Sequence, residues 1–252
     1  MTKRTLIGAL AVALALICIG CNSSTNNPTS LDKPDVSADG SGNGATLTLS
    51  WGAVTDAKYY EITAGGTVDT TSSTSFTITT PATTFEVRAV AGTVKSDPAA
   101  IDCKVVEGTA TFYGDDVTLA HENGFGFSSS GAVVLCTLST GGRYGMDFYA
   151  ESSHAQIKLA PARQTASKMG DQLKAATGSY DSITVADSLP YVGFVVLQAD
   201  SSYCLRMSSD TTGVTWSAAD HFAKAKVDSI VGTKISVTTA YQPIGGLRWL
   251  VK

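Results

Sequence analysis

The chain has 252 residues and a formal charge of −4; 43% of its residues are hydrophobic and 16% are charged. A core can therefore be buried, and the lack of a dense Lys/Arg block argues against nucleic acid as a partner. The composition also excludes a coiled coil and a multi-span membrane protein. Seventeen Asp against five Glu, together with 24 Gly, favour short strands joined by turns over helices.

The N-terminal residues have the pattern of an export signal. Lys3 and Arg4 form a basic head, and an apolar run of about fourteen residues follows from Leu6 to Ile19. This run is shorter than the roughly 20 residues that a membrane-spanning helix needs. It ends before Cys21, and the Ser, Thr, Asn and Pro of residues 22–32 are typical of a flexible tether.

Residues 1–20 together with Cys21 resemble a bacterial lipoprotein signal peptide. The resemblance implies that the chain is cut before Cys21, that the thiol carries a diacylglyceryl group, and that the new amine is acylated. The match departs at Cys18, where this family usually has Leu, and an ordinary secretory signal with an incidental Cys21 is the alternative. In Gram-negative members, Asn22 after the lipidated Cys favours the outer membrane. The resemblance thus implies a lipid-anchored outer-membrane protein that faces either the periplasm or the cell surface.

Residues 33–104 carry a series of short alternating segments. Leu47, Leu49 and Trp51 alternate with Thr48 and Ser50, which is the period of a half-buried strand. Three further segments alternate in the same way: Tyr60 and Ile62, Phe76 and Ile78, and Phe85, Val87 and Ala89. Gly- and Pro-containing turns separate them, so we expect an antiparallel sandwich.

These segments resemble a fibronectin type III domain. The resemblance rests on Pro34 before Val36, the strand that ends at Trp51, Ala57 before Tyr60, the segment from Phe85 to Val90, and the turn Ser96-Asp97-Pro98. Phe85 stands where the family has a corner tyrosine, so the hydrogen bond of that hydroxyl is missing. In bacterial envelope proteins such a domain is most often a spacer.

Residues 105–252 continue the β-type composition with frequent glycines. The expected strands are Thr109–Tyr113, Ala132–Leu138, Met146–Tyr149, Ala155–Leu159, Phe194–Leu197, Tyr203–Met207, Phe222–Ile230 and Lys234–Tyr241. One segment differs, because Arg163 to Ala176 has helix formers with Met169 and Leu173 four residues apart, and this predicts a short helix. The fold class is therefore all-β, with a second, larger antiparallel domain that is a jelly roll or an open barrel and has at most one short helix.

The end of this second domain resembles the C-terminal region of uncharacterised envelope lipoproteins. The likeness consists of a strand with Ala223, Lys224 and Val227 followed by a last strand that ends at Tyr241-Gln242. It extends faintly to HmuY-type haem-binding lipoproteins, which share a signal-anchored, all-β build. That resemblance implies haem or metal capture as an alternative function.

No catalytic constellation is present in the sequence. There is no Gly-x-Ser-x-Gly motif, no phosphate-binding Gly loop, and no pair of acids with a hydrolase pattern. We therefore expect a non-enzymatic protein without an obligatory cofactor. His121 and His154 could meet across strands and hold a metal or haem iron, but the sequence favours separate surface or turn histidines.

Three cysteines remain once Cys21 is lipidated: Cys103, Cys136 and Cys204. Cys136 and Cys204 both fall on expected strands of the second domain, which makes them the pair expected to form a disulfide in an oxidising compartment. The alternative is that all three are buried and reduced.

Aromatic residues next to turns provide the candidate binding residues. Phe125 is flanked by glycines, Tyr144 follows Gly-Gly-Arg143, and Trp216 lies among Gly, Thr and Ser, so each ring could stack on a sugar. Trp216 is the first choice because its neighbours are polar, and Trp249 is expected near the exposed end. Plugging the ends of a barrel is the alternative role for such rings.

Together these features predict a non-enzymatic envelope lipoprotein. Its C-terminal β domain is expected to bind a glycan, a protein or a small ligand, while the membrane is reached through the lipid anchor and nucleic acid is not a partner. A structural role in envelope assembly, in which edge strands pair with another protein, is a further alternative.

Overall fold

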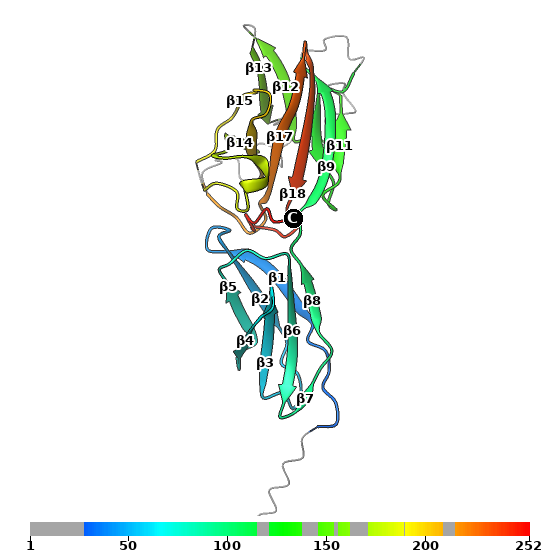
Figure 1. Ribbon diagram of the computed structural model, residues 1–252, viewed down its shortest axis with the longest axis vertical. Coiled ribbons are helices and arrows are strands. Elements are labelled where there is room, and N and C mark those ends of the chain that lie inside the picture. The colour runs from blue at the N-terminus through cyan, green and yellow to red at the C-terminus, as the bar shows by residue number, and fades with distance from the viewer. Residues whose placement is uncertain are drawn as a thin grey trace, which may run out of the picture.

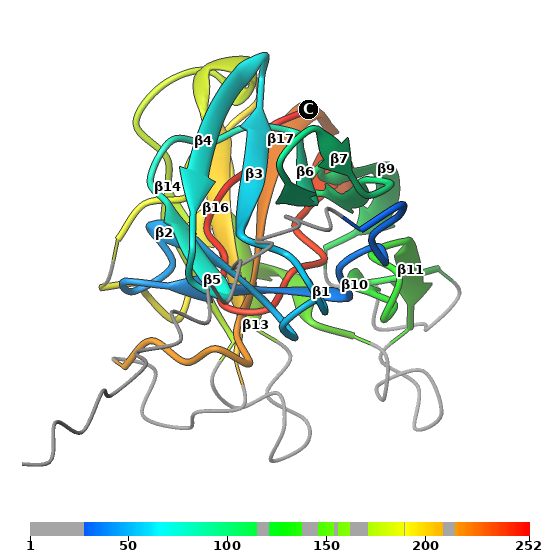
Figure 2. The same ribbon diagram turned by 90° about the horizontal axis from the view of Figure 1, so that it is seen from below.

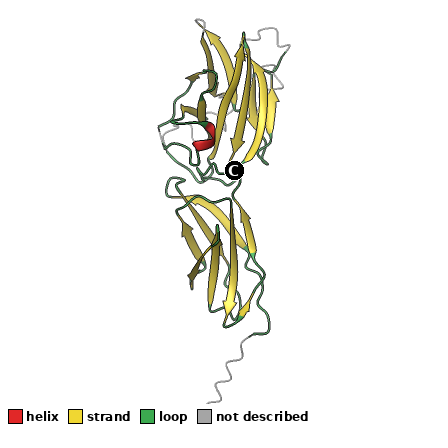
Figure 3. Cartoon of the chain, in the orientation of Figure 1, coloured by secondary structure: helices red, strands yellow, loops and turns green. Residues whose placement is uncertain are grey.

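The computed structural model describes residues 28–114, 121–137, 146–153, 156–161, 171–188, 190–208 and 215–252. Two antiparallel β domains are stacked along the long axis of the molecule (Figure 1). They overlap in the view along that axis, which shows that they are stacked end to end rather than side by side (Figure 2). Strands dominate the described residues, whose single helical element is the short 3₁₀ turn η3, Tyr180–Ser182 (Figure 3). The predicted all-β fold is confirmed.

The N-terminal domain is a sandwich of two sheets. One sheet has the order β1-β2-β5, and the other has the order β4-β3-β6 with β7 and β8 along the far side of β6. The strands are β1 Val36–Ser41, β2 Thr46–Trp51, β3 Tyr59–Ala64, β4 Thr67–Thr71, β5 Ser75–Ile78, β6 Thr84–Ala91, β7 Val94–Lys95 and β8 Ala99–Asp102. This arrangement is fibronectin type III-like, as the sequence predicted.

The core of this sandwich follows from the alternation in the sequence. Leu47, Leu49 and Trp51 of β2 are buried, whereas the intervening Thr48 and Ser50 are only partly covered. Trp51 contacts Tyr60 of β3 edge to face, with ring centroids 5.1 Å apart. Because successive side chains point to opposite faces of a strand, each alternating segment contributes one apolar face to the core.

The C-terminal domain contains two five-stranded sheets. Their orders are β11-β10-β12-β13-β15 and β14-β16-β17-β18-β9. The strands are β9 Val106–Tyr113, β10 Gly124–Phe127, β11 Val133–Cys136, β12 Phe148–Ser153, β13 Gln156–Pro161, β14 Gln172–Ala175, β15 Val195–Val196, β16 Ser202–Met207, β17 His221–Val231 and β18 Lys234–Tyr241. Edge strand β9 approaches β11, and β14 approaches β15, so the two sheets form a flattened, partly closed barrel around one core.

The helix predicted for residues 163–176 is wrong in its second half. Gln172–Ala175 is strand β14, which pairs with β16 through Gln172 opposite Arg206 and Leu173 opposite Leu205. Leu173 is fully buried in the core, while residues 162–170, including Met169, lie outside the described part of the chain. Pairing with an open sheet edge satisfies the backbone and buries Leu173, and this outweighs helix propensity, which is a weak preference.

The eleven residues 242–252 run between the two domains. They follow β18, and the C-terminus lies at the junction (Figure 1). Leu247 and Trp249 are fully buried and belong to the core cluster of the N-terminal sandwich, where the ring of Trp249 lies 6.1 Å from that of Phe85. The indole Nε1 of Trp249 donates a hydrogen bond of 3.0 Å to the carbonyl of Ala45. The predicted exposure of Trp249 is therefore wrong, because the end of the chain turns back and fills the first domain.

Backbone contacts fix this junction. The amide of Gly40 donates to the carbonyl of Gly245 at 3.0 Å, and the amide of Arg248 donates to the carbonyl of Gly44 at 3.0 Å. A Cβ atom at Gly40 would collide with the backbone of Gly246. Only glycine at position 40 therefore allows these two backbone segments to lie this close. The domains are thus joined by hydrogen bonds and shared packing. In the described part of the chain, no helix has the length and apolar character needed to cross a membrane.

Candidate functional site

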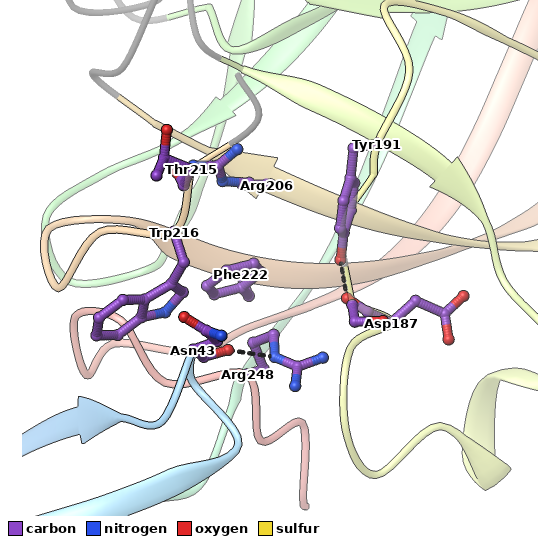
Figure 4. Close-up of a pocket in the computed structure, with 9 residues that line it drawn as sticks. Asn43, Asp187, Tyr191, Arg206, Thr215, Trp216, Phe222 and Arg248 are labelled. Carbon is purple, nitrogen blue, oxygen red and sulfur yellow. Dashed lines mark hydrogen bonds between the residues drawn. The ribbon is translucent and has the colours of Figure 1, made fainter. Parts of the chain in front are cut away.

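A cavity of about 360 Å³ lies at the junction of the two domains. It is lined by residues of the β1–β2 turn, the segments before β15 and before β17, strands β16 and β17, and the C-terminal segment: Asn43, Asp187, Ser188, Tyr191, Arg206, Thr215, Trp216, Phe222 and Arg248. In Figure 4, Thr215 and Trp216 lie on one side, Tyr191 and Asp187 lie on the other, and Phe222 and Arg248 lie between them. Asn43 is the lining residue that the N-terminal domain contributes, and the C-terminal part of the chain contributes the others.

Three aromatic rings form the apolar part of the wall. Trp216 is half-buried, and its indole Nε1 donates a 2.9 Å hydrogen bond to the carbonyl of Gly246. Phe222 is almost fully buried behind it. The hydroxyl of Tyr191 donates to the carbonyl of Asp187 at 2.9 Å, and burial raises the pKa of Tyr191 well above its usual value. Tyr191 is therefore neutral at physiological pH, and its hydroxyl fixes the position of the ring.

Arg206 is fully buried and its charge is compensated within the protein. Its Nε and Nη2 donate to Oδ2 of Asp220 at 3.0 and 2.7 Å, and Nη2 also donates to the carbonyl of Thr215. The same Oδ2 accepts the amide of Ser217 at 2.9 Å. A buried pair with these additional hydrogen bonds anchors the segment that carries Trp216.

Arg248 has a different environment. Its Nε donates to the carbonyl of Asn43 at 2.8 Å and its Nη1 donates to the carbonyl of Ala186 at 2.7 Å, so the guanidinium links a turn of the first domain to a loop of the second. Both acceptors are neutral. Among the described residues no carboxylate lies within 4.0 Å of it. The carboxylate of Asp187 points away from this guanidinium in Figure 4 and lies 3.9 Å from Nζ of Lys174.

The predicted aromatic binding residues lie in different environments. Trp216 lines the cavity, as a binding residue would. The prediction for Phe125 is wrong, because its ring is fully buried in the core of the C-terminal domain, 5.3 Å from Phe112 and 5.8 Å from Phe148. Its glycine neighbours allow close strand packing at a sheet rather than exposure: a Cβ at Gly124 would collide with the backbone of Phe148. Tyr144 lies outside the described residues.

The predicted histidine site has only one described member. His121 is exposed and stacks on Tyr113 with ring centroids 4.4 Å apart. His154 lies outside the described residues, as does Cys21. Among the residues that the structure describes, no group of three or more His, Cys, Asp or Glu side chains is placed to hold a metal ion.

The predicted disulfide between Cys136 and Cys204 is wrong. Cys136 lies on β11 in a small cluster with Met146, whereas Cys204 lies on β16 of the other sheet, next to Phe222 and Tyr191. Strands of different sheets hold the two thiols apart. Burial raises the pKa of Cys204 to about 11, and burial together with the nearby charge of Asp102 raises that of Cys103 to about 12. The alternative of buried, protonated thiols therefore describes Cys103 and Cys204.

Sequence reasoning missed most of the cavity. Asn43, Tyr191 and Arg248 come from three separate segments, and no local pattern connects them. The available signal was the triplet Leu247-Arg248-Trp249, in which a charge lies between two large apolar residues. Such alternation indicates a segment with one buried face.

Comparisons with known proteins give little further information. No protein-family model matches the chain, and no curated protein matches it. A solved structure described as "Structure of FN3tt mut" is similar to it at 30% identity with a TM-score of 0.26. That similarity covers 29% of this chain and 92% of the other.

Proposed function

We propose that this protein is a non-enzymatic lipoprotein of a bacterial outer membrane that binds a small ligand in the cavity between its two domains. The observation that carries the proposal is the cavity itself. Both domains build it, three aromatic rings line it, and it contains a guanidinium group with no carboxylate partner among the described residues.

The form of the cavity is that of a ligand site. Small-molecule sites measure roughly 300–1,000 Å³ and combine an apolar lining with a few convergent polar groups. The junction cavity, at about 360 Å³, lies at the lower end of that range. Its walls are held in place beforehand, because Arg206 is bonded to Asp220 and Tyr191 is bonded to the backbone of Asp187. A site organised in advance loses less entropy when a ligand binds.

The lining supports binding better than catalysis. The nine residues include no His, Cys or Glu. Tyr191 has a raised pKa and already donates its proton to a carbonyl, so it is a poor base and a poor nucleophile. Arg206, the other large polar group, is occupied by Asp220. The arrangement lacks the pairing of a nucleophile with a base that covalent catalysis requires.

The remaining parts of the chain complete the proposal. Residues 1–20 would direct export, Cys21 would carry the lipid, and residues 22–32 would give the domains reach from the membrane. The fibronectin type III-like domain then has two roles, as a spacer and as the source of Asn43 in the cavity wall. Two acyl signals or more hold a protein at a membrane far better than one.

The test uses residues 21–252 with Cys21→Ser, expressed without the signal and screened against a panel of glycans and small envelope metabolites. We expect a ligand whose affinity falls at least tenfold in Trp216→Ala and less in Trp216→Phe, which keeps a ring. Phe194→Ala is the matched control, because Phe194 is an exposed aromatic residue that does not line the cavity. A ligand that binds both alanine variants with the affinity of the parent would place the binding site elsewhere and contradict the proposal.

The anchor is tested separately in the full-length chain. Incorporation of labelled palmitate and recovery in the outer-membrane fraction should both be lost in Cys21→Ser. They should persist in Cys18→Ser, the control for the neighbouring thiol. Retention of the label in the Cys21 variant would show that another residue is the acceptor.

A further inference from the structure

We propose that the junction cavity selects a ligand of one ring with a single carboxylate, as in an acidic monosaccharide, and that Arg248 is the group that binds the carboxylate. This inference rests on the proposed function and names its ligand class. It follows from the charges in the cavity, the free donors of Arg248 and the polar groups around them.

One positively charged group of the cavity has no counter-charge among the described residues. Three of its lining residues belong to the charged residue types: Arg206, Asp187 and Arg248. Arg206 is neutralised by Asp220 at 2.7 Å, and Asp187 is 3.9 Å from the ammonium of Lys174. Arg248 has only the neutral carbonyls of Asn43 and Ala186 as partners. A ligand with one negative charge would therefore complete the charge balance of the site.

The guanidinium is oriented but not saturated. Arginine has five N–H donors, and the two hydrogen bonds to Asn43 and Ala186 use two of them. These bonds come from opposite sides of the junction and restrict rotation of the side chain. The donors that remain suit the planar, bidentate geometry of a carboxylate, which is among the strongest hydrogen-bonded pairs in proteins.

The rest of the wall suits a hydroxylated ring. Trp216 offers an aromatic surface on one side, and sugar rings stack on such surfaces through their apolar faces. The side chains of Asn43, Ser188 and Thr215 are exposed at the rim, and no hydrogen bond within the described structure engages them. Sugar hydroxyls could replace the solvent at these three polar groups with direct hydrogen bonds, which the alkyl chain of a fatty acid could not do. The volume of about 360 Å³ lies at the lower end of the range for ligand sites, which suits a small ligand.

A phosphate fits the site less well than a carboxylate. A phosphate monoester carries between one and two negative charges at neutral pH, and the cavity offers one uncompensated positive charge. The excess charge would lie near the carboxylate of Asp187, which is itself a lining residue. A phosphorylated sugar is therefore the informative competitor in the experiment below.

The experiment is isothermal titration of residues 21–252 carrying Cys21→Ser. Glucuronate, galacturonate and N-acetylneuraminate are compared with glucose, N-acetylglucosamine and glucose 6-phosphate. We expect at least one acidic sugar to bind tenfold or more tightly than the neutral sugars, with an affinity that falls as salt is added. Arg248→Gln should abolish that preference. Arg88→Gln, which removes a cation of the N-terminal domain far from the cavity, should leave the preference unchanged.

Arg248 also joins the domains, so a second pair of variants separates binding from folding. Ser188 is exposed and makes no side-chain hydrogen bond within the described structure. Ser188→Glu introduces a negative charge at the rim, and it should weaken the acidic sugar at least tenfold, while the neutral match Ser188→Gln should not. Both variants leave the bonds of Arg248 intact.

Equal affinity for acidic and neutral sugars would overturn the inference and leave the proposed function standing. A preference for glucose 6-phosphate would overturn the carboxylate assignment in the same way. If no sugar binds but another envelope metabolite does so in a Trp216-dependent manner, the inference again fails alone. Absence of any ligand would remove both the inference and the proposed function.

Discussion

The two domains of this protein are both antiparallel and both all-β, yet they differ in how their cores are completed. The C-terminal domain closes its core with its own two sheets. The N-terminal sandwich includes Leu247 and Trp249 in its core, although these residues follow the last strand of the other domain. The difference shows that a boundary between strand sets, here between Asp102 and Val106, need not be a boundary between folding units.

The small size of the N-terminal domain explains why its core needs Leu247 and Trp249. A sandwich of about 70 residues buries a smaller fraction of its surface than a larger domain, and its stability is correspondingly small. One buried aromatic side chain removes about 150–250 Å² of surface from water. Trp249 therefore supplies a substantial part of the apolar burial that this domain has.

Removal of Trp249 tests this difference between the domains most directly. Trp249→Ala should lower the free energy of unfolding by about 3–5 kcal/mol, because it leaves a cavity beside Phe85 and removes the bond to Ala45. Hydrogen exchange should show the loss of protection mainly in β2, β3 and β6. Val68→Ala, at an exposed position, is the control and should change stability by less than about 0.5 kcal/mol. Loss confined to the C-terminal sheets would contradict the shared core.

The second prediction concerns the buried ion pair of Arg206 and Asp220, which stabilises only the C-terminal domain. Asp220→Asn removes the carboxylate that lies 2.7 Å from the buried guanidinium of Arg206, and we expect a loss of about 3–5 kcal/mol. Exchange protection should fall in β16 and β17 and largely persist in β2 and β3. The half-exposed pair Glu86–Arg88 is the matched control, since Glu86→Gln should cost at most about 1 kcal/mol. Similar losses in both variants would mean that Arg206 does not need this partner.

The third prediction concerns the contact between the domains at Gly40, which lies outside both cores. Gly40→Ala forces a Cβ atom into the backbone of Gly246, and we expect a cost of about 1–3 kcal/mol together with a wider junction. Gly52→Ala is the matched control, because open space surrounds its Cβ position and neither glycine has a positive φ. Small-angle scattering should detect a change in overall dimensions for the first variant alone. Identical profiles for both would show that the close approach at Gly40 is dispensable.

The smallest effect concerns two of the buried thiols, Cys103 beside the N-terminal core and Cys204 in the C-terminal domain. Cys103 has a pKa of about 12 and Cys204 has one of about 11, both above the usual thiol value near 8.5. As pH rises above about 9, the unfolded chain loses these protons and the folded chain keeps them, so the free energy of unfolding falls with pH. Denaturation between pH 8 and 11 should show a shallower decline in Cys103→Ala for the N-terminal domain and in Cys204→Ala for the C-terminal domain. An unchanged slope in both variants would show that other groups govern the alkaline response.

The strands were predictable from the sequence because alternation is a local property. The segment around Leu47, Leu49 and Trp51 has one apolar face wherever it lies, and the structure confirms that strand. Leu173 shows the limit of such reasoning. Its spacing from Met169 fitted a helix, but the open edge of β16 decided the outcome. Phe125 shows a second limit, because flanking glycines occur both in exposed turns and in strands that pack closely.

The candidate site was predictable in one residue only. The polar neighbours of Trp216 indicated partial exposure, and the structure places its ring at the wall of the cavity. Nothing near Arg248 in the sequence shows that its partners would be two carbonyl groups rather than an acid. That information depends on which loops the docked domains bring together.

The sequence by itself determined the all-β class and the order of most strands, since period-two patterns and turn residues act over a few positions. Tertiary structure decided which rings are covered, where the last residues lie and which charge remains uncompensated. The hydrogen bonds that settle these points join Trp249 to Ala45 and Arg248 to Asn43, across 204 and 205 positions of the chain. No local pattern can encode contacts at that separation, because they form only when both domains are folded and packed against each other.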